Sequence, residues 1–171
     1  MNEPGPEAVH PGALAKGLSL GAAVIILDQI TKWWILDVAM NPPTVTPVTG
    51  FFNLVLTWNR GISFGLFNNG HDWNAMILSG LAGVIVIVLL IWLRKADRGI
   101  LVLAIGLIIG GAIGNVIDRF RFGAVVDFLD FHLAGYHWPA FNVADAAIFV
   151  GAMILIADAL FHKREVPKTE E

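Results

Sequence analysis

The chain has 171 residues, of which 56% are hydrophobic and 15% are charged. Soluble domains carry about 25% charged residues, so this composition is typical of a membrane protein. A formal net charge of −3 gives no overall basic field for nucleic acid, and the absence of cysteine excludes disulfides, thiolate metal sites and a cysteine nucleophile. At this length we expect one domain over residues 1–171.

Four long apolar runs predict four membrane-spanning helices, because about 20 helical residues cross the hydrocarbon core. We expect spans at residues of about 14–36, 75–93, 99–117 and 143–161. The first run has a weak basic flank and is interrupted by Asp28, so we interpret it as a retained span and not as a signal peptide. Gly106, Gly110 and Gly114 are four residues apart, which predicts a helix face that packs closely against a neighbour.

The segment 41–72 differs from the apolar runs. Its prolines exclude a helix interior, and the residues that follow them are rich in β-branched and aromatic types. Asn59, Arg60 and Gly61 are typical turn residues. We therefore predict a short β-hairpin that turns at Asn59–Gly61 and lies against the membrane surface.

The distribution of Lys and Arg predicts the orientation. Four spans place both termini on one side of the membrane, together with seven of the 11 Lys and Arg residues. Lys and Arg accumulate on the cytoplasmic side, so we expect cytoplasmic termini. The β region and the connection between the last two spans would then face outward.

Polar residues gather in residues 110–145, between the third and fourth spans. This stretch contains Asp118, Asp127, Asp130 and Asp145, and polar groups at the ends of membrane segments are a functional-site hypothesis by default. The third span ends and the fourth begins at the same membrane face, so folding can bring Asp127 and Asp145 together. Two adjacent carboxylates do not both ionise easily, so one keeps a proton and the pair can activate water.

Several of these residues also have a structural interpretation. Asn142 and Asp145 fit a helix N-cap followed by an acid in the first turn. A helix N-terminus favours an ionised carboxylate, so Asp145 could cap the helix and also be the charged member of the pair. Asp127 could instead be an exposed loop acid, and Arg119 could simply anchor the end of the third span.

Other polar residues follow the spacing of a helix. Asn115 and Asp118 fall on one face of the last turn of the third span, where Asn115 can donate to a carboxylate or a peptide carbonyl. Asp28 and Lys32 lie one turn apart near the interface, which favours a local ion pair with a structural role.

Two further patterns resemble a catalytic motif and a metal-binding motif, but each lacks a feature that its motif requires. Residues 61–65 match the G-x-S-x-G pattern of serine hydrolases, but Ser63 lies in a predicted hairpin with no helix directly after it. His132 and His137 are not accompanied by an H-E-x-x-H motif, and their spacing matches neither one strand face nor one helix turn. We therefore expect no metal and no cofactor.

Five motifs resemble, in order along nearly the whole chain, those of the bacterial lipoprotein signal peptidases (signal peptidase II). They are DQITK from Asp28, NRGISFG from Asn59, GGAIGNVIDR from Gly110, VVDF around Asp127 and FNVAD ending at Asp145. The family usually has Ala where this chain has Ser63. The resemblance implies an all-α membrane protein with four transmembrane helices and a small extracytoplasmic β-hairpin or β-cradle.

The resemblance also implies a function. It implies an aspartic endopeptidase of the bacterial cytoplasmic (inner) membrane, which removes the signal peptide from diacylglyceryl-modified prolipoproteins by cleaving just before the lipidated Cys. Asp127 and Asp145 would be catalytic. Asn115, Arg119 and Asn142 would bind the substrate, and the supporting residues would be Asp28, Asn59, Gly61 and Asp118. The expected partners are prolipoproteins, membrane lipid and globomycin-type inhibitors, with no nucleic acid, and the protein would be a monomer.

Two other classes of function remain open from the residues alone. A small proton-coupled transporter could use paired carboxylates to carry protons, but transport sites usually lie near the bilayer midplane. A non-catalytic membrane scaffold could use the polar groups only to hold helices together, and it would tolerate Asp→Asn changes.

Overall fold

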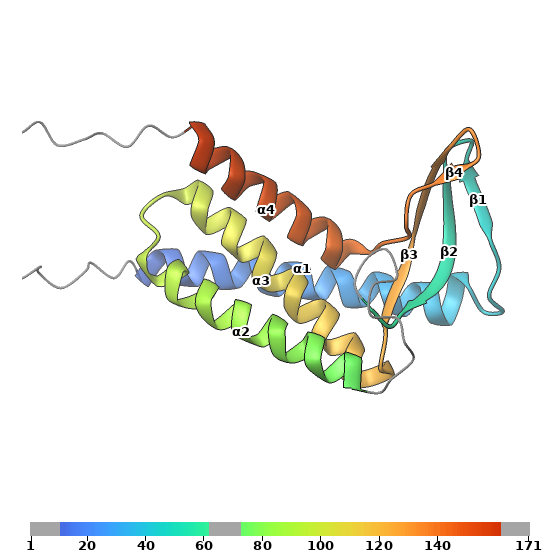
Figure 1. Cartoon of the computed structure of the whole chain (residues 1–171), viewed down its shortest axis with the longest axis horizontal. Helices are drawn as coiled ribbons and strands as arrows, with labels where there is room; N and C mark the ends of the chain where they lie inside the picture. Colours follow the sequence, from blue (N-terminus) through green and yellow to red (C-terminus); the bar gives the residue numbers. More distant parts are fainter. Residues whose placement is uncertain (1–10, 62–72, 162–171) are drawn as a thin grey trace, which may run out of the picture.

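The structure is a computed structural model that describes residues 11–61 and 73–161. Its helices are α1 (Pro11–Trp34), the π-helical turn η1 (Ile35–Ala39), α2 (Trp73–Lys95), α3 (Gly99–Phe122) and α4 (Val143–Phe161). Its strands are β1 (Thr46–Thr49), β2 (Phe52–Asn59), β3 (Val125–Leu133) and β4 (Tyr136–His137). The long helices form a bundle, and the strands form a sheet beyond one end of it (Figure 1).

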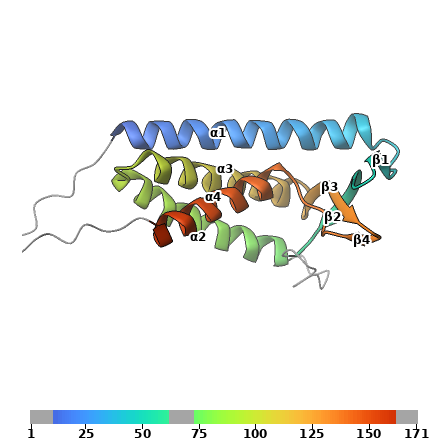
Figure 2. The same ribbon diagram turned by 90° about the horizontal axis from the view of Figure 1, so that it is seen from above.

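Four helical segments in the described part of the chain are long and apolar enough to cross a membrane. They are Gly12–Ala39, Trp73–Lys95, Gly99–Phe122 and Val143–Phe161. Helix α3 is central, since 61% of its most apolar window is buried, against 17% in α2 and in α4 (Figure 1 and Figure 2). The four spans and the small sheet confirm the predicted fold class.

Glycines allow α1 and α4 to approach α3 closely; the spacing of Gly106, Gly110 and Gly114 predicts such a face, and Gly111 adds the contact with α4. A Cβ atom added to Gly110 would lie 2.6 Å from the carbonyl oxygen of Gly21 in α1. A Cβ atom added to Gly111 would lie 2.3 Å from the carbonyl oxygen of Ala144 in α4. Backbone atoms cannot move aside as a flexible side chain can, so these two positions fix the distances from α3 to both neighbours.

The four strands pair in the order β1-β2-β3-β4, each antiparallel to the next. The chain reverses between Thr49 and Phe52, where β1 joins β2. The predicted hairpin turn at Asn59–Gly61 comes at the end of β2, and the strand that would follow such a turn lies outside the described residues. The described partners of β2 are β1 and the distant strand β3, which pairs with it from Phe52↔Phe131 to Asn59↔Val125.

The sheet is attached to the bundle through the end of the first span. Ile35 of η1, Met40 and Phe128 of β3 form a buried apolar cluster. Phe128 also donates its backbone N–H to the carbonyl oxygen of Phe141 at 3.0 Å, just before α4. The contacts of Phe128 therefore place the middle of β3 between the end of α1 and the start of α4.

Candidate active site

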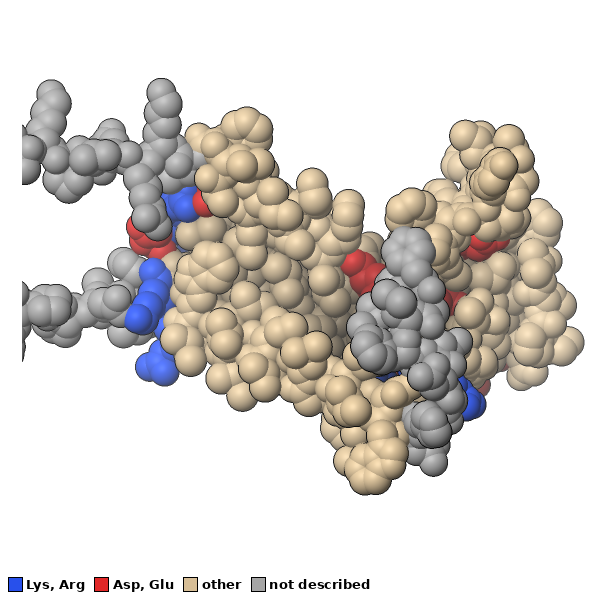
Figure 3. Space-filling model, viewed as in Figure 1, with Lys and Arg blue, Asp and Glu red and all other residues tan. Residues whose placement is uncertain are grey.

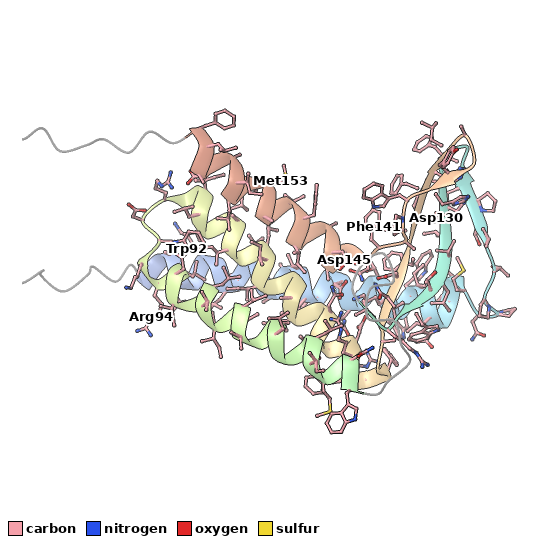
Figure 4. All side chains as sticks on the ribbon, in the orientation of Figure 1. Trp92, Arg94, Asp130, Phe141, Asp145 and Met153 are labelled. Carbon is pink, nitrogen blue, oxygen red and sulfur yellow. The ribbon has the colours of Figure 1, made fainter. Side chains whose placement is uncertain are left out.

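Asp127 and Asp145 meet where the sheet joins the helices. Asp127 lies in β3, and Asp145 lies in the first turn of α4, at the end of that helix nearest the sheet (Figure 4). Asn142 links them, because its Nδ2 donates to Asp127 Oδ1 at 2.7 Å while its Oδ1 accepts the backbone N–H of Asp145 at 2.9 Å. Asp145 Oδ2 accepts the backbone N–H of Asn142 at 3.3 Å, which completes a reciprocal cap.

Two further amides bind the remaining oxygens of the pair. Asn115 Nδ2 of α3 donates to Asp145 Oδ1 at 2.7 Å, and Asn59 Nδ2 of β2 donates to Asp127 Oδ2 at 3.0 Å. The backbone N–H of Gly61 donates to Asn59 Oδ1 at 3.1 Å, so the NH₂ group of Asn59 points to Asp127. Each carboxylate thus receives a hydrogen bond on both oxygens.

Burial makes the carboxyl group of Asp127 a weaker acid than usual. Only 2% of its surface is exposed. Desolvation on burial, with the nearby charge of Asp145 adding to it, raises the pKa of Asp127 to about 7, although the hydrogen bonds from Asn59 and Asn142 oppose the rise. Asp127 is therefore suited to hold a proton near neutral pH, as a general acid must.

Arg119 lies beside the pair. Its NH1 donates to the backbone carbonyl of Asn115 at 3.4 Å, and its guanidinium interacts electrostatically with Asp145, Asp127 and Asp118. Its positive charge therefore lies close enough to influence the candidate catalytic carboxylates. This is a different position from that of an arginine that only anchors the end of α3.

Lys32 lies at the centre of the polar residues, a position that the sequence did not predict. Its ammonium group lies 2.8 Å from Asp28 Oδ2, 2.8 Å from Asp118 Oδ2 and 3.2 Å from Asn115 Oδ1. The spacing of Asp28 and Lys32 showed a local ion pair, whereas the contacts to α3 depend on how α1 packs. A lysine inside an apolar span was the available signal, since such residues are rarely buried without a purpose.

The two acids paired with Lys32 hold the backbone beside the candidate catalytic residues. Asp28 Oδ1 accepts the N–H of Ala144 at 3.0 Å, one residue before Asp145. Asp118 Oδ2 accepts the N–H of Val126 at 3.1 Å, one residue before Asp127.

Gln29 was also missed. Its Nε2 donates to Asp118 Oδ1 at 2.9 Å and to Asp28 Oδ2 at 3.2 Å, so it bridges the two supporting acids. The residues singled out from the sequence lie in one connected site. They are Asp28, Asn59, Gly61, Asn115, Asp118, Arg119, Asp127, Asn142 and Asp145.

Within residues 11–61 and 73–161, Asp130 and His132 take no part in this network. Asp130 accepts hydrogen bonds from Asn53 Nδ2 at 2.8 Å and His137 Nδ1 at 2.8 Å, on another part of the sheet. The rings of His132 and His137 stack at 4.9 Å because β3 and β4 pair them directly, so the two residues face each other across two strands and do not share one strand face. In residues 11–61 and 73–161, no group of three His, Cys, Asp or Glu could hold a metal. Ser63 lies outside the described residues.

An apolar pocket opens beside Asp145. It has a volume of about 580 Å³, and Phe141, Phe149 and Val150 form part of its wall, with Asp145 as its carboxylate. The space-filling view shows an acidic side chain in the notch between the helices and the sheet, and Asp145 and Phe141 lie on the two sides of this notch (Figure 3 and Figure 4). Phe149 and Val150 are 66% and 47% exposed, so the apolar wall of the pocket continues onto the outer surface of the membrane-spanning helix α4.

Fold and site together define an integral membrane protein with a pair of carboxylates, one buried and one partly buried, at one end of a four-helix bundle. Residues 20–161 match the family model described as signal peptidase (SPase) II, and the chain belongs to that family.

Similar proteins carry a consistent name. The chain is 50% identical over 145 residues to the lipoprotein signal peptidase of Ralstonia nicotianae, an alignment that covers 84% of this chain and 83% of the relative. It is 45% identical over 150 residues to that of Cupriavidus taiwanensis, covering 86% and 84%. A bacterial membrane enzyme solved at 1.9 Å resolution by the in meso method superposes with a TM-score of 0.77 and 26% identity, covering 92% of this chain and 99% of that one. A second such structure, at 2.3 Å, gives a TM-score of 0.74 and 28% identity, covering 90% and 95%.

Proposed function

We propose that this protein is an aspartic endopeptidase that removes the signal peptide from diacylglyceryl-modified prolipoproteins by cleaving just before the lipidated Cys. Its membership of the signal peptidase II family and the names of its relatives support the substrate. The single observation that supports the aspartic mechanism is the position of Asn142 between the buried carboxylate of Asp127 and the partly buried carboxylate of Asp145.

The carboxylate pair divides the work of hydrolysis. Asp145, ionised at a helix N-terminus, accepts a proton from the water that attacks the scissile carbonyl carbon. Asp127, which holds a proton near neutral pH, donates it to the carbonyl oxygen. When the tetrahedral intermediate collapses, the C–N bond breaks, Asp145 passes its proton to the leaving amine, and the hydroxyl proton returns to Asp127.

The amides and Arg119 position the reactants. Asn115 and Asn142 hold the carboxylates by hydrogen bonds of 2.7 Å, so their orientation is set before substrate arrives. Arg119 is the cationic group near the pair, and we assign it to the substrate peptide. The pocket beside Asp145 accepts apolar parts of a substrate that stays in the membrane.

The distribution of charge supports an outward-facing site. The helix ends away from the sheet carry the side chains of Lys16, Arg94, Lys95 and Arg98, and basic groups are visible there in Figure 3. Basic residues favour the cytoplasmic side, so the sheet and the site lie outside, in an inner-membrane protein with cytoplasmic termini. We further propose that the enzyme is a monomer that binds membrane lipid and globomycin-type inhibitors.

The substrate assignment can be tested by measuring cleavage of one precursor by the purified protein. The precursor is prepared with and without the diacylglyceryl group. We expect cleavage of the modified form only, with the lipidated Cys as the new N-terminus in mass spectrometry. Equal cleavage of the unmodified form, or a cut elsewhere, would contradict the assignment.

A further inference from the structure

A second cavity lies at the end of the bundle away from the sheet, and the candidate active site does not use it. It is a groove of about 510 Å³ between the first turns of α1 and the segment that joins α2 to α3. Lys16 and Asp97 line it together with Leu20, Val102 and Leu103. The volume falls within the roughly 300–1,000 Å³ of small-molecule sites.

The groove runs from the membrane surface into the hydrocarbon region. The first span begins at Gly12 and the third at Gly99, so both groove walls start at the same membrane face. At about 1.5 Å per helical residue, Lys16 lies roughly 6 Å and Leu20 roughly 12 Å along α1 from Gly12. The interfacial layer of each leaflet is roughly 5–8 Å thick, so the charged end lies at headgroup level and the apolar end beside acyl chains.

The two charged groups in the groove have opposite signs. Lys16 comes from α1 and Asp97 from the connection before α3, and both side chains are exposed. Within the described ranges, no ion pair joins the two. Figure 3 likewise shows basic and acidic side chains together at this end of the molecule. The groove therefore offers separate positions for an anionic and a cationic group.

We propose that this groove binds a zwitterionic glycerophospholipid. Its phosphate lies at Lys16, its ammonium group at Asp97, and one acyl chain along Leu20, Val102 and Leu103.

The surroundings and the charges favour this occupant. A groove at this depth is filled by lipid, because the hydrocarbon region contains no water to fill it. An anionic lipid without an ammonium group could pair with Lys16, but its charge would then face Asp97. Arg94 and Lys95 attract anionic lipids to this membrane face in general, yet neither lines the groove.

The test is native mass spectrometry of the full chain in detergent, with phosphatidylethanolamine or phosphatidylglycerol added at equal concentration. We expect the wild type to retain more phosphatidylethanolamine. Asp97→Asn should abolish that preference, while Lys16→Gln should reduce binding of both lipids roughly three- to fivefold, which is the size of an exposed charge contact. Lys16→Arg keeps the charge and should restore binding.

Arg94→Gln is the matched control, because it removes a basic group at the same membrane face but outside the groove. It should leave the lipid preference unchanged. Preferential retention of phosphatidylglycerol by the wild type, an unchanged preference in Asp97→Asn, or an equal loss of binding in Arg94→Gln would overturn the proposal. Lys16, Asp97 and Arg94 are all exposed, so none of these substitutions removes a packed side chain.

Discussion

Asn142 combines two tasks in one side chain. Its oxygen caps α4 by accepting the N–H of Asp145, and its NH₂ group donates to Asp127. Ser, Thr or Asp could provide the cap, but none of them has an amide donor for a second carboxylate. The capping interpretation and the active-site interpretation of this motif therefore describe the same geometry.

Lys32 fixes the orientation of another amide. Because Asn115 Oδ1 lies 3.2 Å from the ammonium group of Lys32, the NH₂ group of Asn115 is turned toward Asp145. The same ammonium contacts both Asp28 and Asp118, whose other contacts hold the backbone beside Asp145 and Asp127. Lys32 thus connects the α1 span to both halves of the candidate catalytic pair.

Asn59→Ala should change the pH dependence of cleavage. The hydrogen bond from Asn59 lowers the pKa of Asp127, so removing it raises that pKa further above its usual value. Since Asp127 acts in its protonated form, the alkaline limb of the kcat profile should move to higher pH.

Asn53→Ala is the control for this shift, because Asn53 donates to Asp130, outside the site. It should leave the alkaline limb in place. A limb that stays fixed or moves to lower pH in Asn59→Ala would show that Asp127 is not the acid.

At the scale of elements, the four spans could be predicted because each apolar run is long enough to cross a membrane by itself. The sequence did not predict the pairing of β2 with β3, because these strands are separated by two spans and no local pattern encodes their register. The contacts of Lys32 and Gln29 with α3 were missed for the same reason.

Gly111→Ala tests how the α3–α4 contact positions the site. The added Cβ would meet the carbonyl of Ala144 at 2.3 Å, so α4 must shift at the residue before Asp145. Overpacking of this kind typically costs about 1–3 kcal/mol, and we expect a lower melting temperature in detergent together with reduced turnover.

Gly80→Ala in α2 is the matched control, because nothing lies within 4 Å of its added Cβ. It should keep activity and gain up to about 1 kcal/mol of helix stability. Equal melting temperatures and equal turnover in the two variants would contradict the close α3–α4 contact.

The sheet contains a pH-dependent contact of its own. Burial opposes ionisation of Asp130, but the hydrogen bonds from His137 and Asn53 outweigh it and hold the pKa of Asp130 below its usual value. A lowered carboxyl pKa stabilises the fold above the unfolded value of about 3.9, and this contribution is lost as the pH falls through the folded value.

Asp130→Asn should therefore melt at a lower temperature than the wild type at neutral pH, and the difference should shrink below about pH 4. Thermal melts of both proteins across this range measure it. A difference that is the same at all pH values would show that the charge of Asp130 contributes nothing to stability.

At the scale of the whole molecule, the polar site lies at one end of the bundle, and Lys16, Arg94, Lys95 and Arg98 lie at the other, while Arg60 and Arg121 are exposed at the site's end (Figure 1 and Figure 3). A proton-coupled transporter would need its acids near the middle of the membrane. Here Asp127 lies in a strand and Asp145 in the first turn of a span, so both are near one surface, where water and a peptide bond are accessible.

The orientation can be tested directly because the chain has no cysteine. Single cysteines that replace Arg60 and Arg94 should be labelled by a membrane-impermeant maleimide from opposite sides. The cysteine at position 60 should be labelled from outside intact cells, and the cysteine at position 94 only after the cytoplasm is opened. The reverse pattern would place the site on the cytoplasmic side.

The central claim is that Asp127 and Asp145 together activate water. Its most direct test is turnover of a diacylglyceryl-modified precursor by purified Asp127→Asn and Asp145→Asn, beside Asp130→Asn, which removes a carboxylate from the same strand outside the site. We expect both site variants to stay folded in a thermal melt and to lose at least about a thousandfold in rate, and Asp130→Asn to stay within about tenfold of the wild type. Near-wild-type cleavage by a folded Asp127→Asn or Asp145→Asn protein would contradict the aspartic mechanism.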